Sequence, residues 1–384
     1  MDRSALLIFV LFSACSCGNQ VQHAEENVQQ ELALVVKDSI QINYAGMLHL
    51  QDIDPDKERL LLYDQQREFF FITDLTGAVL YQIEKEEDGK GSYSYLLGPA
   101  QFHGEDEIFV VAMNGMLTFN FYGELVSHVP FTNEEQAGFS GRPLLAEEFF
   151  PYDGRYLGKG VFSWGEFGKN ERQYYDDFLL LSWFDPEDGS FDRRINLHPE
   201  SLLKSGKAYE VTEMMPAYTL FDNKIYVIVG TDPHLEIYEA NEPYHLISRK
   251  RLQYDPYYPS DGQDMQVADP QVIQVIESSG FTKNLKATSQ YLISGYFPGY
   301  DRTDRERLKD PAISGPEFQQ SIKGKYPEYI HIMDQQGKLL STEANHLNID
   351  LRQFTVRGDD IWAKKMPNEE VEEDFIIIYR IAIE

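Results

Sequence analysis

Carboxylates at alternate positions make residues 52–63 the first segment of the chain that could do chemistry. The run DIDPDKERLLLY places Asp52, Asp54 and Asp56 two residues apart, as a calcium-binding loop does. Such a loop also needs glycine at its sixth position and glutamate at its twelfth, where Lys57 and Tyr63 stand. A tight turn between two strands accounts for the same residues. We therefore expect no metal here, and we assign the chain no cofactor.

Signatures of known enzyme classes are missing from the sequence. It contains no HExxH zinc motif and no SxDxGxxW box, and its nine histidines include no close pair. Ser163 lies among glycines in GKGVFSWGE, but this run is not the GxSxG of a nucleophile elbow. No residue is therefore predicted to be catalytic, and the sequence favours a protein that is not an enzyme.

One enzymatic alternative stays open, and it depends on side chains near the ends of expected inner strands. The candidates are Asp52, His103, Glu148 and Glu213, which show no diagnostic spacing. Paired carboxylates suit general acid–base catalysis. The alternative is therefore a hydrolase or lyase that acts on a sugar, a lactone or a peptide through carboxylates lining a central channel.

Aromatic and basic residues gather in three polar segments, which are the stronger candidates for binding. Taken together, residues 164–176, 254–266 and 298–326 combine tyrosines with the main local concentration of Arg and Lys, and the cations lie in the first and third segments. Such side chains are enriched in recognition sites because they offer large contact areas and strong hydrogen bonds. The predicted ligand-binding residues are Trp164, Arg172, Tyr174, Tyr175, Tyr257, Tyr258, Tyr300, Arg302 and Arg305. The other interpretation is that these segments only cap the fold.

The charge balance of the chain bears on its partners. The 34 Lys and Arg against 63 Asp and Glu give 34 − 63 = −29. Nucleic acid is bound through cationic side chains that displace counterions, so we expect no nucleic-acid partner. A positive cluster on so acidic a molecule favours a small anionic ligand or an acidic protein surface.

The first seventeen residues predict where the chain goes. The apolar run over residues 5–12 is too short to span a bilayer but suits a signal peptide. The two cysteines of the chain, Cys15 and Cys17, follow small residues, and the segment resembles a bacterial lipoprotein signal. The resemblance implies a signal peptide over 1–14, lipid on Cys15 or Cys17, a polar tether over 15–30, and an exported protein anchored in the outer membrane. An ordinary signal peptide with incidental cysteines is the alternative.

The rest of the chain repeats one phrase, in which a polar turn feeds a β-branched and aromatic run. Asp222 and Asn223 make the turn in FDNKIYVIVG. Five further copies occur at 54–64, 103–112, 152–160, 286–295 and 357–365. Short strand candidates precede the six turns at 47–50, 100–102, 144–149, 217–221, 272–276 and 351–356. A second hairpin follows, and three of these hairpins turn on an Asx residue and a glycine, at 74–77, 120–123 and 334–337.

Each unit is thus a meander of four strands, and six units predict an all-β, six-bladed propeller as one domain over residues 31–384. The sixth unit ends at DFIIIYRIAIE without a fourth strand. Residues 32–36 and 39–44 have strand character and no blade of their own. We therefore expect this N-terminal segment to complete the last blade and to remove an exposed edge.

The meander also predicts which face carries the long loops. Connections between the first and second strands lie on one face, and the three long loops at 164–176, 254–266 and 298–326 leave from the other. The repeated turn-strand phrase resembles that of TolB-like and NHL-like six-bladed propellers, and the whole resembles an uncharacterised lipoprotein of the Gram-negative envelope. The resemblance implies the fold and carries no catalytic residue. We expect a binding or scaffold protein that recognises its partner through the long-loop face.

Overall fold

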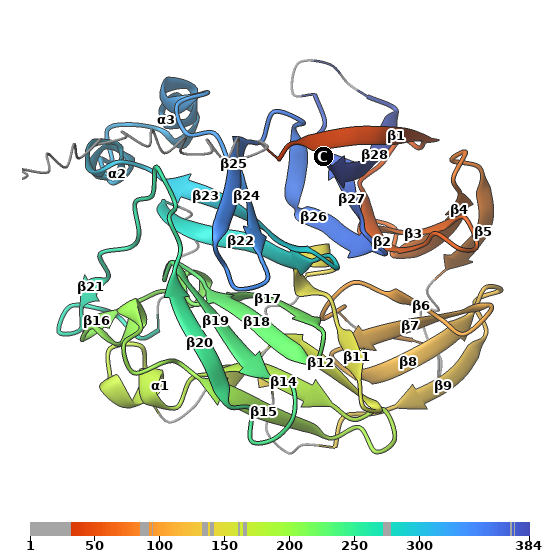
Figure 1. The fold of residues 1–384 in the computed structure, drawn as a ribbon, viewed down its shortest axis with the longest axis horizontal. Coiled ribbons are helices and arrows are strands. Elements are labelled where there is room, and N and C mark those ends of the chain that lie inside the picture. The colour runs from red at the N-terminus through yellow and green to blue at the C-terminus, as the bar shows by residue number, and fades with distance from the viewer. Residues whose placement is uncertain are drawn as a thin grey trace, which may run out of the picture. The chain divides into compact units, whose positions relative to one another are not determined.

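Six four-stranded antiparallel sheets follow one another around a ring in the computed structural model (Figure 1). The structure describes residues 32–84, 92–93, 95–132, 137–138, 142–159, 162–163, 167–271, 278–368, 371 and 373–384. The predicted signal peptide, the tether and both cysteines lie outside these ranges. The expected all-β, six-bladed propeller is confirmed.

The first three blades run from the innermost strand outwards, and each innermost strand is followed by a tight turn. Blade one is β2 Leu48–Asp54, β3 Arg59–Asp64, β4 Phe69–Asp74 and β5 Val79–Glu84. Blade two is β6 Gln101–His103, β7 Glu107–Ala112, β8 Gly115–Asn120 and β9 Leu125–Val129. Blade three is β11 Phe150–Tyr152, β12 Arg155–Lys159, β14 Leu179–Phe184 and β15 Phe191–Asn196.

The last three blades repeat the same order. Blade four is β17 Pro216–Phe221, β18 Lys224–Val229, β19 His234–Glu239 and β20 Leu246–Arg251. Blade five is β22 Ser279–Ala287, β23 Tyr291–Gly299, β24 Tyr329–Asp334 and β25 Leu339–Ala344. Blade six is β26 Ile349–Arg357, β27 Asp360–Lys365, β28 Phe375–Ile383 and, outermost, β1 Leu34–Asn43.

Short elements lie between these strands. Two strand pairs stand apart from the blades, β10 Ala137–Gly138 with β13 Phe162–Ser163 and β16 Lys207–Ala208 with β21 Gln263–Asp264. The α-helices are α1 Arg172–Asp176, α2 Arg302–Leu308 and α3 Gly315–Ile322. The 3₁₀ turns are η1 Leu145–Glu147, η2 Leu202–Lys204 and η3 Val211–Glu213.

The predicted Asx-and-glycine hairpins are confirmed in blades one, two and five. In blade one the Asp74 side chain accepts a hydrogen bond from the Thr76 amide at 2.8 Å, and Gly77 has φ +85°. Blades two and five repeat the motif with Asn120 and Gly123, and with Asp334 and Gly337. Glycine is required at 77 for a second reason, since a Cβ there would lie 2.1 Å from the Gln41 carbonyl oxygen.

Apolar side chains are buried between the blades. The described residues form six hydrophobic clusters, and each cluster joins two neighbouring blades. Between blades one and two, for example, Leu61 and Phe70 pack with Ile108 and Phe119. Because every blade contributes to two of these clusters, the blades cannot separate without exposing apolar surface to water.

Two expected inner strands differ from the structure. In blade three, residues 145–147 form the turn η1, and the inner strand is β11, so the prediction of a strand over 144–149 is wrong. In blade five the inner strand is β22, whereas the predicted 272–276 lies outside the described residues. Thr282, Asn284 and Lys286 gave β22 the polar composition of a loop, yet all three are buried.

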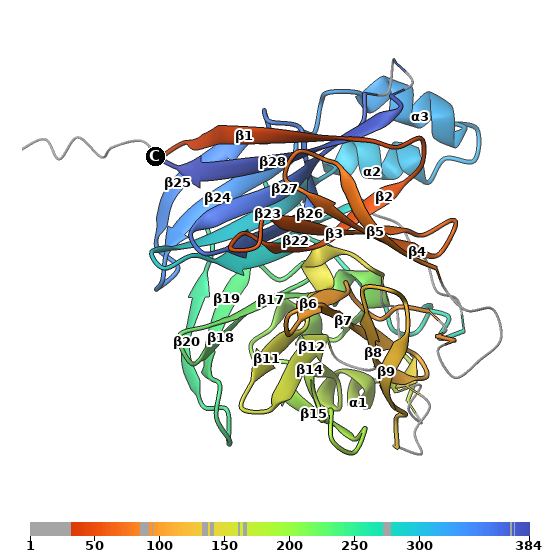
Figure 2. The same ribbon diagram turned by 90° about the vertical axis from the view of Figure 1, so that its right-hand side faces the viewer.

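The N-terminal strand closes the ring as expected. β1 pairs antiparallel with β28 along its length, from Leu34 opposite Ile383 to Asn43 opposite Phe375. Both views show the two strands side by side (Figures 1 and 2). Ile40 and Ile42 of β1 are buried with Leu50 and Leu62 of blade one. The strand therefore completes blade six and also seals the interface between the last blade and the first.

This closure can be tested with one buried side chain. Ile42 is 1% exposed, so Ile42→Ala removes apolar contacts on both sides of the closing interface. We expect the free energy of unfolding, measured by urea titration, to fall by about 2–5 kcal/mol. Gln41, the exposed neighbour of Ile42, gives the control. Gln41→Ala is expected to change the free energy of unfolding by less than about 0.5 kcal/mol. Equal effects of the two substitutions would contradict the closing role of β1.

Candidate functional site

A segment of the chain fills the centre of the ring. Residues 142–149, here called the channel segment, connect blades two and three, and their turn η1 contacts β2, β17, β22 and β26. The turn is the yellow element near the centre of Figures 1 and 2. Leu145 within it is fully buried among residues of blades one and six. The channel is thus partly occupied by the protein itself.

Polar side chains of the inner strands hold the backbone of the channel segment. Gln51 of blade one donates a hydrogen bond to the Pro143 carbonyl at 2.9 Å. Gln101 of blade two donates to the Phe149 carbonyl at 2.6 Å, and Tyr218 of blade four donates to the Glu148 carbonyl at 2.8 Å. These contacts satisfy backbone groups that would otherwise be buried without partners. They also fix the position of the Glu148 side chain.

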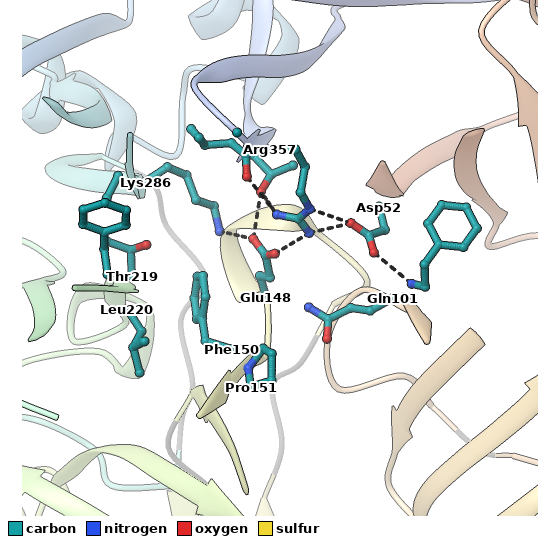
Figure 3. A pocket seen from close by; sticks show the side chains of 15 residues that line it. Asp52, Gln101, Glu148, Phe150, Pro151, Thr219, Leu220, Lys286 and Arg357 are labelled. Carbon is teal, nitrogen blue, oxygen red and sulfur yellow. Dashed lines mark hydrogen bonds and ion pairs between the residues drawn. The ribbon is translucent and has the colours of Figure 1, made fainter. Parts of the chain in front are cut away.

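Four charged side chains meet beside this segment, and we call them the charge quartet: Asp52, Glu148, Lys286 and Arg357. Arg357 donates to an Asp52 oxygen from Nε at 2.9 Å and to Glu148 Oε1 from Nη2 at 2.6 Å. Lys286 Nζ donates to Glu148 Oε2 at 2.8 Å. The quartet joins blades one, five and six to the channel segment (Figure 3).

Hydrogen bonds also fill the remaining positions around the two carboxylates. Asp52 accepts from the amides of Ile53 and Phe102, both at 2.8 Å. Glu148 Oε2 accepts in addition from the Thr355 hydroxyl at 2.9 Å. Both oxygens of Glu148 are therefore occupied by protein donors, which is the arrangement that a buried carboxylate needs.

Burial and charge act in opposite directions on these groups. Burial opposes ionisation of Glu148, but Arg357 and Lys286 outweigh it and lower the pKa of Glu148 to about 2. Burial raises the pKa of Asp52, an effect that Arg357 opposes and Glu148 increases. Burial also lowers the pKa of Lys286, while its ion pair with Glu148 opposes this shift. Glu148 is the firmly ionised member of the quartet.

A cavity of about 360 Å³ lies beside the quartet. Every blade contributes to its lining, which includes Gln101, Phe150, Thr219 and Phe221 as well as the quartet. Figure 3 shows the quartet, Gln101, Phe150 and Thr219 arranged around one space. Most of the lining residues lie at the ends of inner strands, just before the turns to the second strands. The cavity therefore belongs to the face of the ring that carries the short turns.

The long connections leave from the other face and form what we call the insert layer: residues 167–176, 197–215, 252–271 and 300–326. Each lies between the second and third strands of a blade or between two blades. The 197–215 connection was not among the predicted binding segments. It lies between two of them, because its β16 pairs with β21 of 252–271 and its Tyr209 amide donates to the Tyr175 hydroxyl at 2.8 Å.

Several predicted binding residues hold the insert layer together. Tyr175 is 1% exposed and donates to the Lys169 carbonyl at 2.7 Å. Tyr257 is partly buried and donates to the Thr231 carbonyl at 3.0 Å. Arg305 Nη1 donates to the Pro259 carbonyl at 3.0 Å and so joins 252–271 to 300–326. Tyr300 packs against the rings of Phe318 and Tyr326.

The remaining predicted residues lie nearer the surface or outside the described ranges. The side chains of Arg172 and Arg302 are 90% and 91% exposed, and each faces an acidic residue one helical turn away, at 3.7 and 3.1 Å. Tyr174 packs on Phe178, and Tyr258 is partly buried. Trp164 lies outside the described residues. The binding role of all nine residues stays a prediction.

The four candidates for channel chemistry separate in the structure. Asp52 and Glu148 meet in the charge quartet, whereas His103 is exposed and Glu213, in the insert layer, accepts a hydrogen bond from Ser279 of β22. Sequence reasoning missed Lys286 and Arg357. Each opens a copy of the repeated turn phrase, so a basic residue at the end of an inner strand was the available signal. Within the described ranges, no group of three or more His, Cys, Asp or Glu side chains is placed to hold a metal ion.

Comparison with known proteins gives the fold. No protein-family model matches the chain, and no curated protein matches its sequence. A solved member of the DUF4221 family from Bacteroides vulgatus is similar at a TM-score of 0.68 and 12% identity, covering 93% of this chain and 99% of that one. An assumed exported protein from Bacteroides fragilis is similar at 0.51 and 14%, covering 94% and 98%. At these identities the likeness shows the propeller fold, and the finer resemblance to TolB-like and NHL-like proteins stays a prediction.

The quartet predicts how stability depends on pH. Removing one member of a buried ion pair typically costs about 3–5 kcal/mol, so we expect Glu148→Gln to lower the free energy of unfolding by that amount at pH 7. The folded pKa of Glu148 lies below its ordinary value of 4.5. The contribution of ionised Glu148 to the free energy of unfolding is therefore complete above pH 4.5 and lost as pH falls through 2. The difference in this free energy between wild type and variant should narrow by about 3 kcal/mol over that range.

Urea titrations of both proteins between pH 7 and pH 2 measure this gap. Glu187→Gln, a change in an exposed turn, is the matched control and should follow the wild type at every pH. A gap that stays constant down to pH 2 would contradict the ionised, paired state of Glu148.

Proposed function

We propose that this protein is an exported, lipid-anchored propeller of the cell envelope that binds or scaffolds an acidic partner through the insert layer. The single observation that carries the proposal is that four long connections leave one face of the ring and are bonded to one another in sequence. Long loops on a rigid scaffold are where binding residues concentrate. The tight turns of the other face offer no comparable surface.

The charge of one connection in the insert layer, residues 300–326, supports an acidic or anionic partner. Residues 300–326 contain six Lys and Arg against five Asp and Glu, which gives 6 − 5 = +1 in a chain whose net charge is −29. The exposed ion pairs of Arg172 and Arg302 are worth little in water, so these arginines are able to exchange their present partners for a bound carboxylate or phosphate.

Export and anchoring rest on the N-terminal sequence. The apolar run and the two cysteines support a lipoprotein signal, and the outer membrane is the proposed location. One structurally similar protein is assumed to be exported. None of the helices in the described ranges has the length and apolarity that a membrane crossing requires.

A hydrolase or lyase is the second candidate, and it rests on the approach of Asp52 and Glu148 in the cavity. The raised pKa of Asp52 is the feature that favours it. Glu148 speaks against it, because both of its oxygens already accept hydrogen bonds from the protein. Turnover on a panel of glycans, lactones and peptides that disappears in Asp52→Asn but survives chelation would favour the enzyme.

Charge reversal on the insert layer tests partner binding. We expect the double variant Arg172→Glu and Arg302→Glu to lose the partner that co-purifies with wild type from solubilised membranes. Wild-type binding should weaken as salt rises, because at about 1 M the screening length falls to roughly 3 Å. Lys338→Glu reverses an exposed charge in a short turn of blade five and should retain the partner. Loss in the Lys338 variant alone would place binding on the other face.

Metabolic labelling with a fatty-acid analogue tests the anchor. We expect label on the wild type and none on a variant in which both Cys15 and Cys17 are Ser. One of the two single variants should keep the label, and the cysteine that remains in it is the modified residue. Label that persists when both cysteines are replaced would refute lipid anchoring.

A further inference from the structure

We infer that the cavity beside the charge quartet is a second binding site, and that its ligand is a neutral, hydroxyl-rich molecule of the size of one sugar ring. This site lies on the short-turn face and is independent of the proposed partner surface. Its volume of about 360 Å³ falls within the usual range of small-ligand pockets. Residues of all six blades line it, so its shape is fixed by the whole ring.

The charges around the cavity favour a neutral ligand. In their ionised, paired forms Asp52 and Glu148 carry two negative charges and Lys286 and Arg357 two positive ones, so the formal charge of the quartet is zero. A charged ligand would place an uncompensated charge beside these buried ion pairs, which is costly. Arg357 cannot compensate for a new anion, because its nitrogens already donate to Asp52, Glu148, Thr355 and the Val356 carbonyl.

Hydrogen-bonding capacity remains in the lining even though the net charge is zero. An ammonium group has three donors, and among the described residues Lys286 Nζ uses one, to Glu148. The Thr219 hydroxyl makes no hydrogen bond to any described residue, and Gln101 uses its amide nitrogen on Phe149 but not its oxygen. These groups offer both donors and an acceptor, which match the hydroxyl groups of a sugar.

Apolar surface completes the site. Phe150 and Pro151 lie together on one side of the space in Figure 3, and the Phe150 ring is 5.0 Å from Lys286 Nζ. Phe221 adds a second ring to the lining. A flat aromatic surface beside convergent polar groups suits a ligand with one apolar face and several hydroxyls. A free monosaccharide and the terminal residue of a glycan present this same chemistry.

Calorimetric titration of the full chain tests the site. The probes are neutral hexoses and N-acetylhexosamines, the corresponding uronic acids and amino sugars, and oligosaccharides that end in the neutral sugars. We expect a neutral sugar to bind at least tenfold more tightly than its charged analogues. Binding of the monosaccharide indicates a free sugar as ligand, and binding of the oligosaccharide alone indicates a glycan end.

Substitution of Thr219 locates the binding in the cavity. Thr219→Val keeps the shape of the side chain and should weaken binding about five- to tenfold through the lost hydroxyl, whereas Thr219→Ser should retain it. Thr342→Val, the same change on the exposed outer strand of blade five, is the control and should bind like the wild type. The insert layer is unchanged in all three variants, so failure here leaves the proposed partner surface untouched.

Three results would overturn the assignment. The first is that no neutral sugar in the panel binds to the folded wild-type chain. The second is that a uronic acid or an amino sugar binds as tightly as the neutral sugar. The third is that Thr219→Val and Thr342→Val bind with equal affinity.

Discussion

The ion pairs that Glu148 makes at the centre of the ring are the interaction on which the inner structure depends. Apolar contacts hold each blade only to the blades next to it. Glu148 reaches Lys286 of blade five and Arg357 of blade six, and Arg357 in turn reaches Asp52 of blade one. A buried ion pair is tolerated only when every charge has partners in good geometry. The inner strands must therefore hold the positions that keep these pairs in hydrogen-bonding geometry.

This requirement explains how polarity is distributed in the protein. Apolar side chains fill the six interfaces between blades, and the axis is lined by polar ones. Gln51, Gln101 and Tyr218 donate to the channel segment, and Asn284 donates to the Phe354 carbonyl at 2.9 Å. Each of these donors satisfies a backbone group away from bulk water. The centre of the ring is thus a hydrogen-bonded layer inside an apolar one.

The sequence predicted the blades because their signals are local. The Asx-and-glycine turns and the β-branched runs recur in order, so the number of blades and the role of β1 followed from them. The inner strand of blade five was misplaced because Thr282, Asn284 and Lys286 face inward, and polar residues normally indicate a surface. Periodicity does not distinguish a polar channel from solvent.

The candidate site was predicted only in part, for a related reason. Asp52 and Glu148 were recognised as channel carboxylates, but their cations were not, because Lys286 and Arg357 are 138 and 209 residues away from Glu148 in the chain. Such pairs are created by ring closure and leave no local pattern. The aromatic and basic segments were found by composition, and composition does not reveal that Tyr175 is buried while Arg302 is exposed.

The pairing of β1 with β28 has a consequence for the order in which the protein is made. β1 is the first of the described strands to leave the ribosome, and its partner β28 is the last of them. Until residue 383 has emerged, β1 presents an unpaired edge with Ile40 and Ile42 uncovered, which invites association with other chains. During synthesis this edge therefore stays open until β28 is available, and a chaperone that covered β1 in this interval would suppress such association.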